Sequence, residues 1–305
     1  MITRAVFIRL AGLGPLLSLS SPATLSPITL PLKLLPNSGL LTATLSLHGR
    51  QVQTIIDTGS PFLTYTSFDV DGGAIDGAEC RDISYEQYGE EMLKVTWNER
   101  VEVGVGSEKL GRLRVGAVEV KQGVNSNYLG LVYKDGVRPS FLSQLGFAFF
   151  TLSYASQTLR LSASTSSKPL AHPFYDFAPC CSNAYFYATA LSSLSLKGEV
   201  INPPPGRDLV VVIDSGLSGL IIDEECRDVL FKGRVLGEEE ISLNLMNDEV
   251  WSVRNKRLFA VTSYKLPWFD NSKGKDDIPL VVAIGGAYLW GRTLTVDTNQ
   301  MRFSL

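Results

Sequence analysis

The stretch IIDTGS (residues 55–60) decides how this chain is interpreted. It drives an apolar run straight into a carboxylate and follows it at once with a hydroxyl residue and a glycine. An Asp at the end of a buried strand is costly unless neighbouring groups hold its charge. Asp57 therefore either caps a turn or takes part in chemistry.

A second copy of this stretch lies in the other half of the chain. VQTIIDTGS (52–60) is matched by VVVIDSGLS (210–218), where apolar residues again run into Asp, a hydroxyl residue and Gly. Either triplet alone is a frequent turn, whereas two copies that each end an apolar β-type run are hard to ascribe to accident. After excursions of similar length, each copy is followed by an apolar segment around a glycine, Gly130 and Gly285. This pattern predicts a duplicated lobe.

Short β-type segments separated by turn residues dominate the sequence. Helical patterns are confined to residues 139–147, with a Pro expected at the first helical position, and 223–231, behind an Asp cap. We therefore predict an all-β fold with a few short helices. The expected strands are 42–56 (two strands joined at His48-Gly49-Arg50), 93–97, 100–105, 112–120, 185–196, 209–213, 258–264, 279–284 and 293–305.

Composition restricts the function. The chain has 305 residues with a formal net charge of -3, so nothing in its charge points to nucleic acid. Its longest apolar runs are shorter than the roughly 18 residues of a membrane span. With only His48 and His172, the chain offers little for zinc chemistry or a Ser-His-Asp system, and GLSG (216–219) lacks the spacing of a nucleophile elbow. We expect neither metal nor cofactor.

The four cysteines do not indicate whether the protein works in an oxidising or a reducing compartment. None forms a CxxC pair, so a zinc site is not expected. Buried or unpaired thiols are the plainer interpretation, and one or two disulfides remain open because connectivity cannot be deduced from sequence. The cysteines are Cys80, Cys180, Cys181 and Cys226.

Residues 1–26 are typical of a targeting segment. No acidic residue precedes Asp57, and the segment is rich in Ser and Leu. Arg9 interrupts its apolar stretch, so an organelle transit peptide, for example to a plastid, fits about as well as a secretory signal.

The order of the motifs resembles a pepsin-type (A1) aspartic protease from about residue 27 to the C-terminus. IIDTGSPFLTY and VVIDSGLSGLII resemble the two active-site motifs of that family, and VVAIGGAYLWGRTLTVDTNQMRFSL resembles its C-terminal end. The resemblance implies a bilobal fold, with two related barrel-like lobes and a cleft between them. We then expect an N-terminal lobe (27–161), a Ser-rich linker (162–168) and a C-terminal lobe (169–305).

The resemblance implies hydrolysis of peptide bonds by a water molecule between two carboxylates, Asp57 and Asp214. Two carboxylates about 3 Å apart share one proton because both cannot ionise together, so one acts as base and the other as acid. Gly59 and Gly216 let the backbone approach the carboxylates. The resemblance further implies that the hydroxyls of Thr58 and Ser215 brace the two loops, and that Ser60 binds the outer oxygen of Asp57. A peptide or protein substrate and a monomer are expected.

A β-hairpin flap is expected within ISYEQYGEEMLKVTW (83–97). The family closes such a flap over substrate with a tyrosine, which excludes water. Tyr88 precedes a glycine, as the flap tyrosine does in the family. Tyr85, two residues after Ile83, is the alternative.

Leu217 departs from the family pattern, which has Ser or Thr after Asp-Ser-Gly. Loss of a hydrogen bond to Asp214 raises the lower titration step of the pair, so activity is expected at milder pH than for a stomach-type enzyme. If the first strand begins near residue 27, a propeptide of usual length has no room. A catalytically impaired pepsin-fold binding or inhibitor protein is the second hypothesis, which Leu217 and the unusual flap favour.

Overall fold

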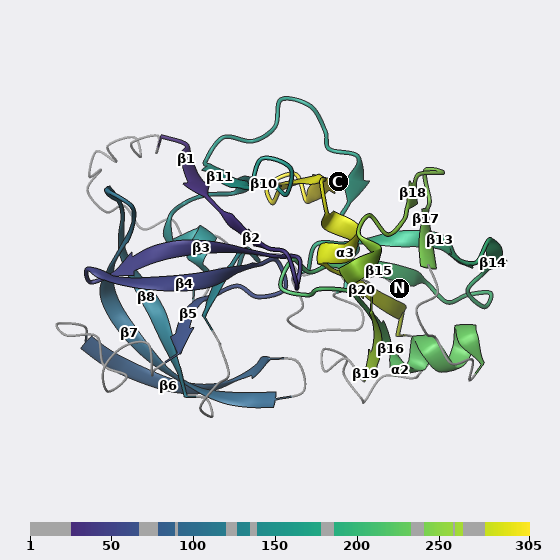
Figure 1. Cartoon of the computed structure of the whole chain (residues 1–305), viewed down its shortest axis with the longest axis horizontal. Coiled ribbons are helices and arrows are strands. Elements are labelled where there is room, and N and C mark those ends of the chain that lie inside the picture. The colour runs from purple at the N-terminus through teal and green to yellow at the C-terminus, as the bar shows by residue number, and fades with distance from the viewer. Residues whose placement is uncertain are drawn as a thin grey trace, which may run out of the picture.

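The computed structural model describes residues 26–66, 79–88, 91–119, 127–134, 139–177, 186–232, 241–258, 260–264 and 278–305. The predicted targeting segment, apart from Ser26, lies outside these residues, as do Cys180 and Cys181. The described part of the chain is mostly β, arranged in two lobes, which confirms the predicted fold class (Figure 1).

The N-terminal lobe is an eight-stranded sheet. It curls back on itself because β3 also pairs with β7, at Ser46↔Gly104 and Leu47↔Val103. In spatial order its strands are β2 (Lys33–Leu35), β3 (Leu40–Leu47), β4 (Arg50–Asp57), β9 (Tyr128–Gly130), β5 (Leu63–Thr66), β8 (Glu108–Glu119), β7 (Glu91–Val105) and β6 (Glu79–Tyr88).

The C-terminal lobe holds a second eight-stranded sheet. Its path is β18 (Val250–Trp251), β17 (Ile241–Leu245), β13 (Ala188–Leu196), β15 (Leu209–Ile213), β20 (Leu280–Ile284), β16 (Leu220–Asp223) and β19 (Val261–Tyr264), with β14 (Glu199–Ile201) on β13. β15 and β20 are buried along their whole length, as expected for parallel neighbours made of Val, Leu, Ile and one Ala.

The same local topology recurs in both lobes. In the first, β9 lies between β4, to which it is parallel, and β5, to which it is antiparallel. In the second, β20 lies in the same way between β15 and β16. The apolar segments around Gly130 and Gly285 therefore support the strands that lead into Asp57 and Asp214.

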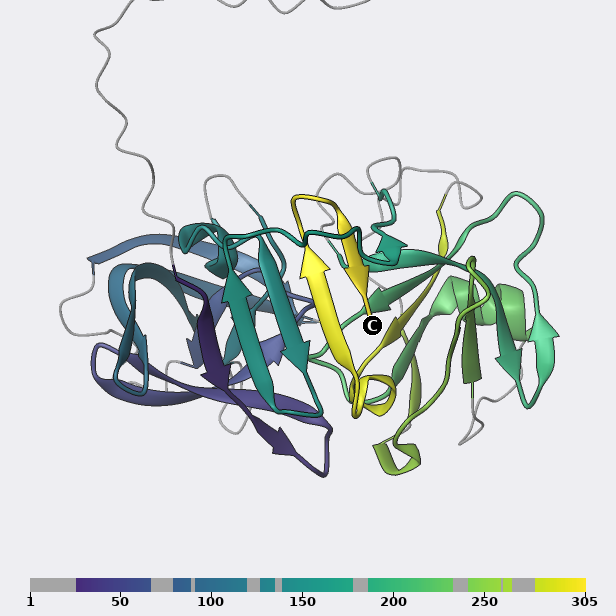
Figure 2. The same ribbon diagram turned by 90° about the horizontal axis from the view of Figure 1, so that it is seen from above.

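A six-stranded sheet joins the halves. It orders β1 (Ile28–Pro31), β11 (Thr158–Ser162), β10 (Phe149–Ser153), β21 (Thr293–Asp297), β22 (Arg302–Ser304) and β12 (His172–Pro173). The purple and teal strands of the first half flank the yellow C-terminal strands in Figure 2. Because β10 pairs with β21 from Phe149↔Asp297 to Ser153↔Thr293, one sheet contains strands from both predicted lobes. The buried core is continuous across them.

Helices are few and short. They are α1 (Phe141–Gln144), α2 (Glu224–Cys226), the π-helical turn η3 (Arg227–Phe231), the 3₁₀ turn η4 (Lys256–Leu258) and α3 (Gly286–Leu289). Asp223 caps α2 as predicted, since its side chain accepts from the Glu225 N–H. The helix predicted within 139–147 is present, but its start was placed wrongly: the first helical residue is Phe141, not Pro139, and Ser140 is the N-cap, whose side chain accepts from the Ser143 N–H. Within the described residues, no helix is long and apolar enough to cross a membrane.

Of two strand predictions, the structure confirms one and corrects the other. The hairpin at His48-Gly49 is confirmed, and both of its turn residues have positive φ, 47° and 83°. Residues 93–97 and 100–105, predicted as two strands, belong to the single strand β7. A bulge absorbs the interruption, because the register with β8 shifts between Asn98 and Val101 and Arg100 has a φ of 56°.

Candidate active site

Two loops at the ends of buried strands carry the predicted carboxylates. Asp57 is the last residue of β4, and Asp214 directly follows β15. Hydrogen bonds with the segments around Gly130 and Gly285 hold the backbones of both residues. The Leu131 N–H donates to the Asp57 carbonyl at 2.8 Å, and the Asp214 N–H donates to the Ile284 carbonyl at 2.9 Å. Asp57 is 7% exposed and Asp214 is partly buried.

Thr58 and Ser215 connect the loops through four hydrogen bonds. The Thr58 N–H donates to Ser215 Oγ at 3.0 Å, and the Ser215 N–H donates to Thr58 Oγ1 at 2.9 Å. The two hydroxyls donate in turn to the carbonyls of Ile213, at 2.9 Å, and Ile56, at 2.7 Å. Both side chains are completely buried. Each hydroxyl therefore satisfies backbone of the opposite lobe, and the contact has approximate two-fold symmetry.

Gly59 and Gly216 allow the carboxyls to meet. Each glycine N–H donates to the Asp two residues before it, at 2.8 Å for Asp57 Oδ1 and 2.9 Å for Asp214 Oδ1. A Cβ on Gly59 would lie 2.5 Å from Asp214 Oδ2, and one on Gly216 would lie 2.7 Å from Asp57 Oδ1. Each glycine thus touches the carboxyl of the other lobe. The two carboxyls therefore lie close together, and each affects the titration of the other.

The two carboxyls differ in their surroundings. Burial raises the pKa of Asp57, but N–H groups of Gly59 and Ser60, the Ser60 hydroxyl and the hydrogen bond from Asp214 oppose this rise. The pKa of Asp214 lies well above its ordinary value because of burial, then the charge of Asp57 and the shared hydrogen bond, while the Gly216 N–H opposes the rise. The surroundings therefore favour the charged form more at Asp57 than at Asp214.

Ser60 and Leu217 account for part of this difference. The Ser60 hydroxyl is buried and lies close enough to Asp57 to lower its pKa, less than the Gly59 N–H does, although it meets no hydrogen-bond partner at ordinary geometry. At the corresponding place in the other lobe, Leu217 packs against an apolar cluster that includes Val212 and Ala283. A leucine donates nothing from its side chain, so Asp214 receives less support as an anion.

Two tyrosines near the pair were not identified from the sequence. Burial raises the pKa of Tyr128 to about 12, with a further contribution from the charges of Asp57 and Asp214. Burial also raises the pKa of Tyr154, as does the charge of Asp214. Both phenols are therefore neutral wherever the carboxyls titrate. Tyr128 stands two residues before Gly130, and only its register beside Ile55 reveals its position.

The predicted flap is the hairpin of β6 and β7, which pair from Glu79↔Glu99 to Tyr88↔Glu91. Tyr85 lies opposite Lys94 and is 66% exposed, on a face that also exposes Ile83 and Met92. The backbone of Tyr88 pairs with Glu91 at the end of the hairpin, but its side chain lies outside the described residues. The choice between the two tyrosines therefore stays open.

The histidines and the described cysteine lie apart from the pair. His172 is buried with its Nε2 3.1 Å from Glu249 Oε2, and His48 lies in the β3–β4 turn. Cys226 is a buried free thiol, whose pKa burial raises above its ordinary range. The side chain of Cys80 lies outside the described residues. Among the residues that the structure describes, no three His, Cys, Asp or Glu side chains come together as a metal site.

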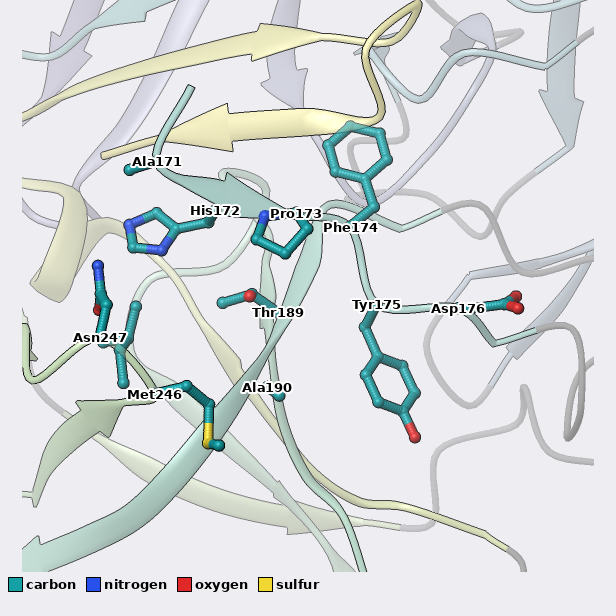
Figure 3. Close-up of a pocket in the computed structure, with 11 residues that line it drawn as sticks. Ala171, His172, Pro173, Phe174, Tyr175, Asp176, Thr189, Ala190, Met246 and Asn247 are labelled. Atoms are coloured by element: carbon teal, nitrogen blue, oxygen red, sulfur yellow. The ribbon is translucent and has the colours of Figure 1, made fainter. Parts of the chain in front are cut away.

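A cavity of about 230 Å³ lies elsewhere on the C-terminal lobe, beside His172 and Met246 (Figure 3). None of the predicted site residues lines it. Neither a family model nor a curated protein matches this chain.

Proposed function

We propose that this chain is an aspartic-type endopeptidase of the pepsin type, in which Asp57 and Asp214 share one proton and act on a water molecule. One observation carries the proposal. The two carboxyls meet at the ends of buried strands from two lobes, each against the glycine of the opposite motif, and four cross-lobe hydrogen bonds fix their loops. Two coupled carboxyls with one proton supply both the base and the acid of hydrolysis.

The unequal surroundings assign the starting roles. Asp57, the better-supported anion, takes a proton from water as the oxygen attacks the peptide carbonyl carbon. Asp214, which holds the shared proton, gives it to the carbonyl oxygen, so a neutral gem-diol forms. In the second step Asp57 passes its proton to the leaving nitrogen while Asp214 takes one from the diol, the C–N bond breaks, and the starting protonation returns.

The substrate class proposed is a peptide in extended conformation. Its backbone would lie between the lobes, and the β6–β7 hairpin would cover it, as strand-like peptides are bound elsewhere. The exposed side chains of Ile83, Tyr85 and Met92 give that hairpin an apolar face, which suits apolar substrate side chains.

The test is incubation of the purified chain with a peptide library from pH 3 to pH 7, with products identified by mass spectrometry. We expect cleavage that a statine-containing peptide of the pepstatin type inhibits and that Asp57→Asn and Asp214→Asn abolish. Asp248→Asn is the matched control, because this exposed residue has a φ of 64°, a conformation that Asn also tolerates. Cleavage that survives Asp57→Asn would refute the proposal.

A binding or inhibitor protein with this fold is the second candidate, and Leu217 is the observation that favours it. The same incubation separates the two. A binding protein would retain peptides or the statine inhibitor without producing fragments, and its Asp57→Asn variant would have no turnover to lose.

A further inference from the structure

We infer that Tyr187 is a positioning residue, which holds the two carboxyl-bearing loops in place relative to each other. The inference rests on the proposed function for its kinetic consequence. Tyr187 is 2% exposed and immediately precedes β13, so it belongs to the C-terminal lobe. Its role is assigned from the hydrogen bonds that its hydroxyl and its carbonyl make with backbone of both lobes.

The hydroxyl grips the N-terminal lobe. It donates to the carbonyl of Leu131 and accepts from the N–H of Tyr133 at 3.2 Å. The N–H of Leu131 donates to the Asp57 carbonyl at 2.8 Å. The segment clamped by the phenol is therefore bonded directly to the backbone that carries the first carboxyl.

The backbone of Tyr187 grips the other loop. Its carbonyl accepts from the N–H of Ile213 at 2.9 Å, one residue before Asp214. The Ile213 carbonyl accepts from the hydroxyl of Thr58, one residue after Asp57. Hydrogen bonds and chain segments thus form a closed circuit through Asp57, Leu131, Tyr187, Ile213 and Thr58. This circuit crosses between the lobes twice, once through the Tyr187 hydroxyl and once through the Thr58 hydroxyl.

The ring of Tyr187 is fixed independently of its hydroxyl. It packs edge-on against Phe150 of β10, with centroids 5.5 Å apart, and at 5.4 Å against Phe174, which also lines the cavity of Figure 3. Both ring contacts remain when the phenol is replaced by a phenyl ring. Tyr187→Phe therefore removes the hydroxyl hydrogen bonds to Leu131 and Tyr133 and keeps the packing. Burial raises the pKa of the Tyr187 hydroxyl, which therefore stays a neutral donor wherever the pair titrates.

The experiment compares Tyr187→Phe with Tyr288→Phe. Tyr288 is equally buried, and its hydroxyl donates to the Ile241 carbonyl at 2.6 Å within the C-terminal lobe, so the control loses the same kind of bond away from the circuit. We expect similar losses of stability, with kcat lowered about 10-fold or more in Tyr187→Phe and KM nearly unchanged, because small misplacements of reacting groups are costly. Equal kcat values for the two variants would overturn the inference.

A second measurement tests the inference even if the chain cleaves no peptide. That outcome would refute the proposed function, but not the positioning role of Tyr187. The raised pKa of Asp214 means that the folded state holds a proton that the unfolded state releases, so the free energy of unfolding falls as pH rises through that range. Tyr128 and Tyr154 stay neutral there. In an inactive chain, Tyr187→Phe should flatten this fall, because loosened carboxyls couple less strongly, while Tyr288→Phe should keep it. A curve for Tyr187→Phe parallel to the unsubstituted protein would then overturn the inference.

Discussion

Gly59→Ala tests whether the close approach of the two carboxyls is what makes this site work. Gly59 is not among the residues with positive φ, so its backbone accepts an L side chain. The three atoms nearest to the new Cβ would all belong to the partner carboxyl: Oδ2, Cγ and Oδ1 of Asp214 lie 2.5, 2.7 and 2.9 Å from its position. The substitution therefore acts on the pair itself.

The size of the effect follows from these distances. Ordinary van der Waals contact begins at 3.4 Å, so the Asp214 carboxyl must retreat by about 0.9 Å from the new methyl group. A displacement of about 1 Å between reacting groups costs roughly 10²-fold in rate. We expect kcat to fall by that factor and KM to change little, because the carboxyls act on the reacting bond more than on the rest of an extended peptide.

The assay measures kcat and KM on one cleaved peptide, together with urea unfolding. Gly198→Ala is the control: its φ of +83° makes alanine strained by about 1–2 kcal/mol, but nothing lies within 4 Å of the added atom. The control should lose stability and keep its rate, whereas Gly59→Ala should lose its rate. A folded Gly59→Ala protein with kcat within about twofold of the original would refute the reasoning, since 2.5 Å leaves no room for both groups.

Three further results are expected. Leu217→Thr offers Asp214 a donor that stabilises its charged form by about 1.5 kcal/mol, so the alkaline limb of the pH–rate profile, where Asp214 would lose the shared proton, should move down by about one unit; an unmoved limb would show that residue 217 does not set it. Ser215→Ala leaves the Thr58 N–H and the Ile56 carbonyl without their buried hydrogen-bond partner, so urea unfolding should show a loss of stability of about 1–3 kcal/mol. A loss below about 0.5 kcal/mol would show that Ser215 does not hold the two loops together. Asp214→Asn removes a carboxyl whose pKa is raised, so the free energy of unfolding should fall less steeply from pH 4 to pH 7, and an unchanged slope in urea titrations would place the shared proton elsewhere.

Local rules were enough for the elements that are determined by their own residues. The His48-Gly49 turn and the Asp223 cap follow from side chains within a few positions of each other. The strand predicted to break near Arg100 does not break, because pairing with β8 on one side and β6 on the other outweighs one unfavourable residue. The six-stranded sheet could not be predicted, since the paired residues of β10 and β21 lie 140 to 148 positions apart and no local pattern links them.

The paired motifs show what repetition in a sequence can establish. Two similar loops predict a two-fold arrangement, and the buried bonds between Thr58 and Ser215, 157 residues apart, have that symmetry. Tyr187 has no such signature, because its hydroxyl binds backbone atoms, which any sequence would present. Side chains that bind backbone of a distant segment therefore escape motif analysis even when they lie in the same circuit as the motif.

The differences between the two loops assign the acid and base roles in the proposed mechanism. If both loops were identical, the two carboxyls would hold the shared proton equally well, and the starting roles of acid and base would be interchangeable. Ser60 supports Asp57 as an anion, while Leu217, at the equivalent place, turns to an apolar cluster. Sequence comparison of the two copies identifies this difference, but only the folded chain shows that both residues lie beside one pair of adjoining carboxyls. The proposed mechanism therefore places the shared proton on Asp214, whose charged form has fewer donors in this buried site than that of Asp57.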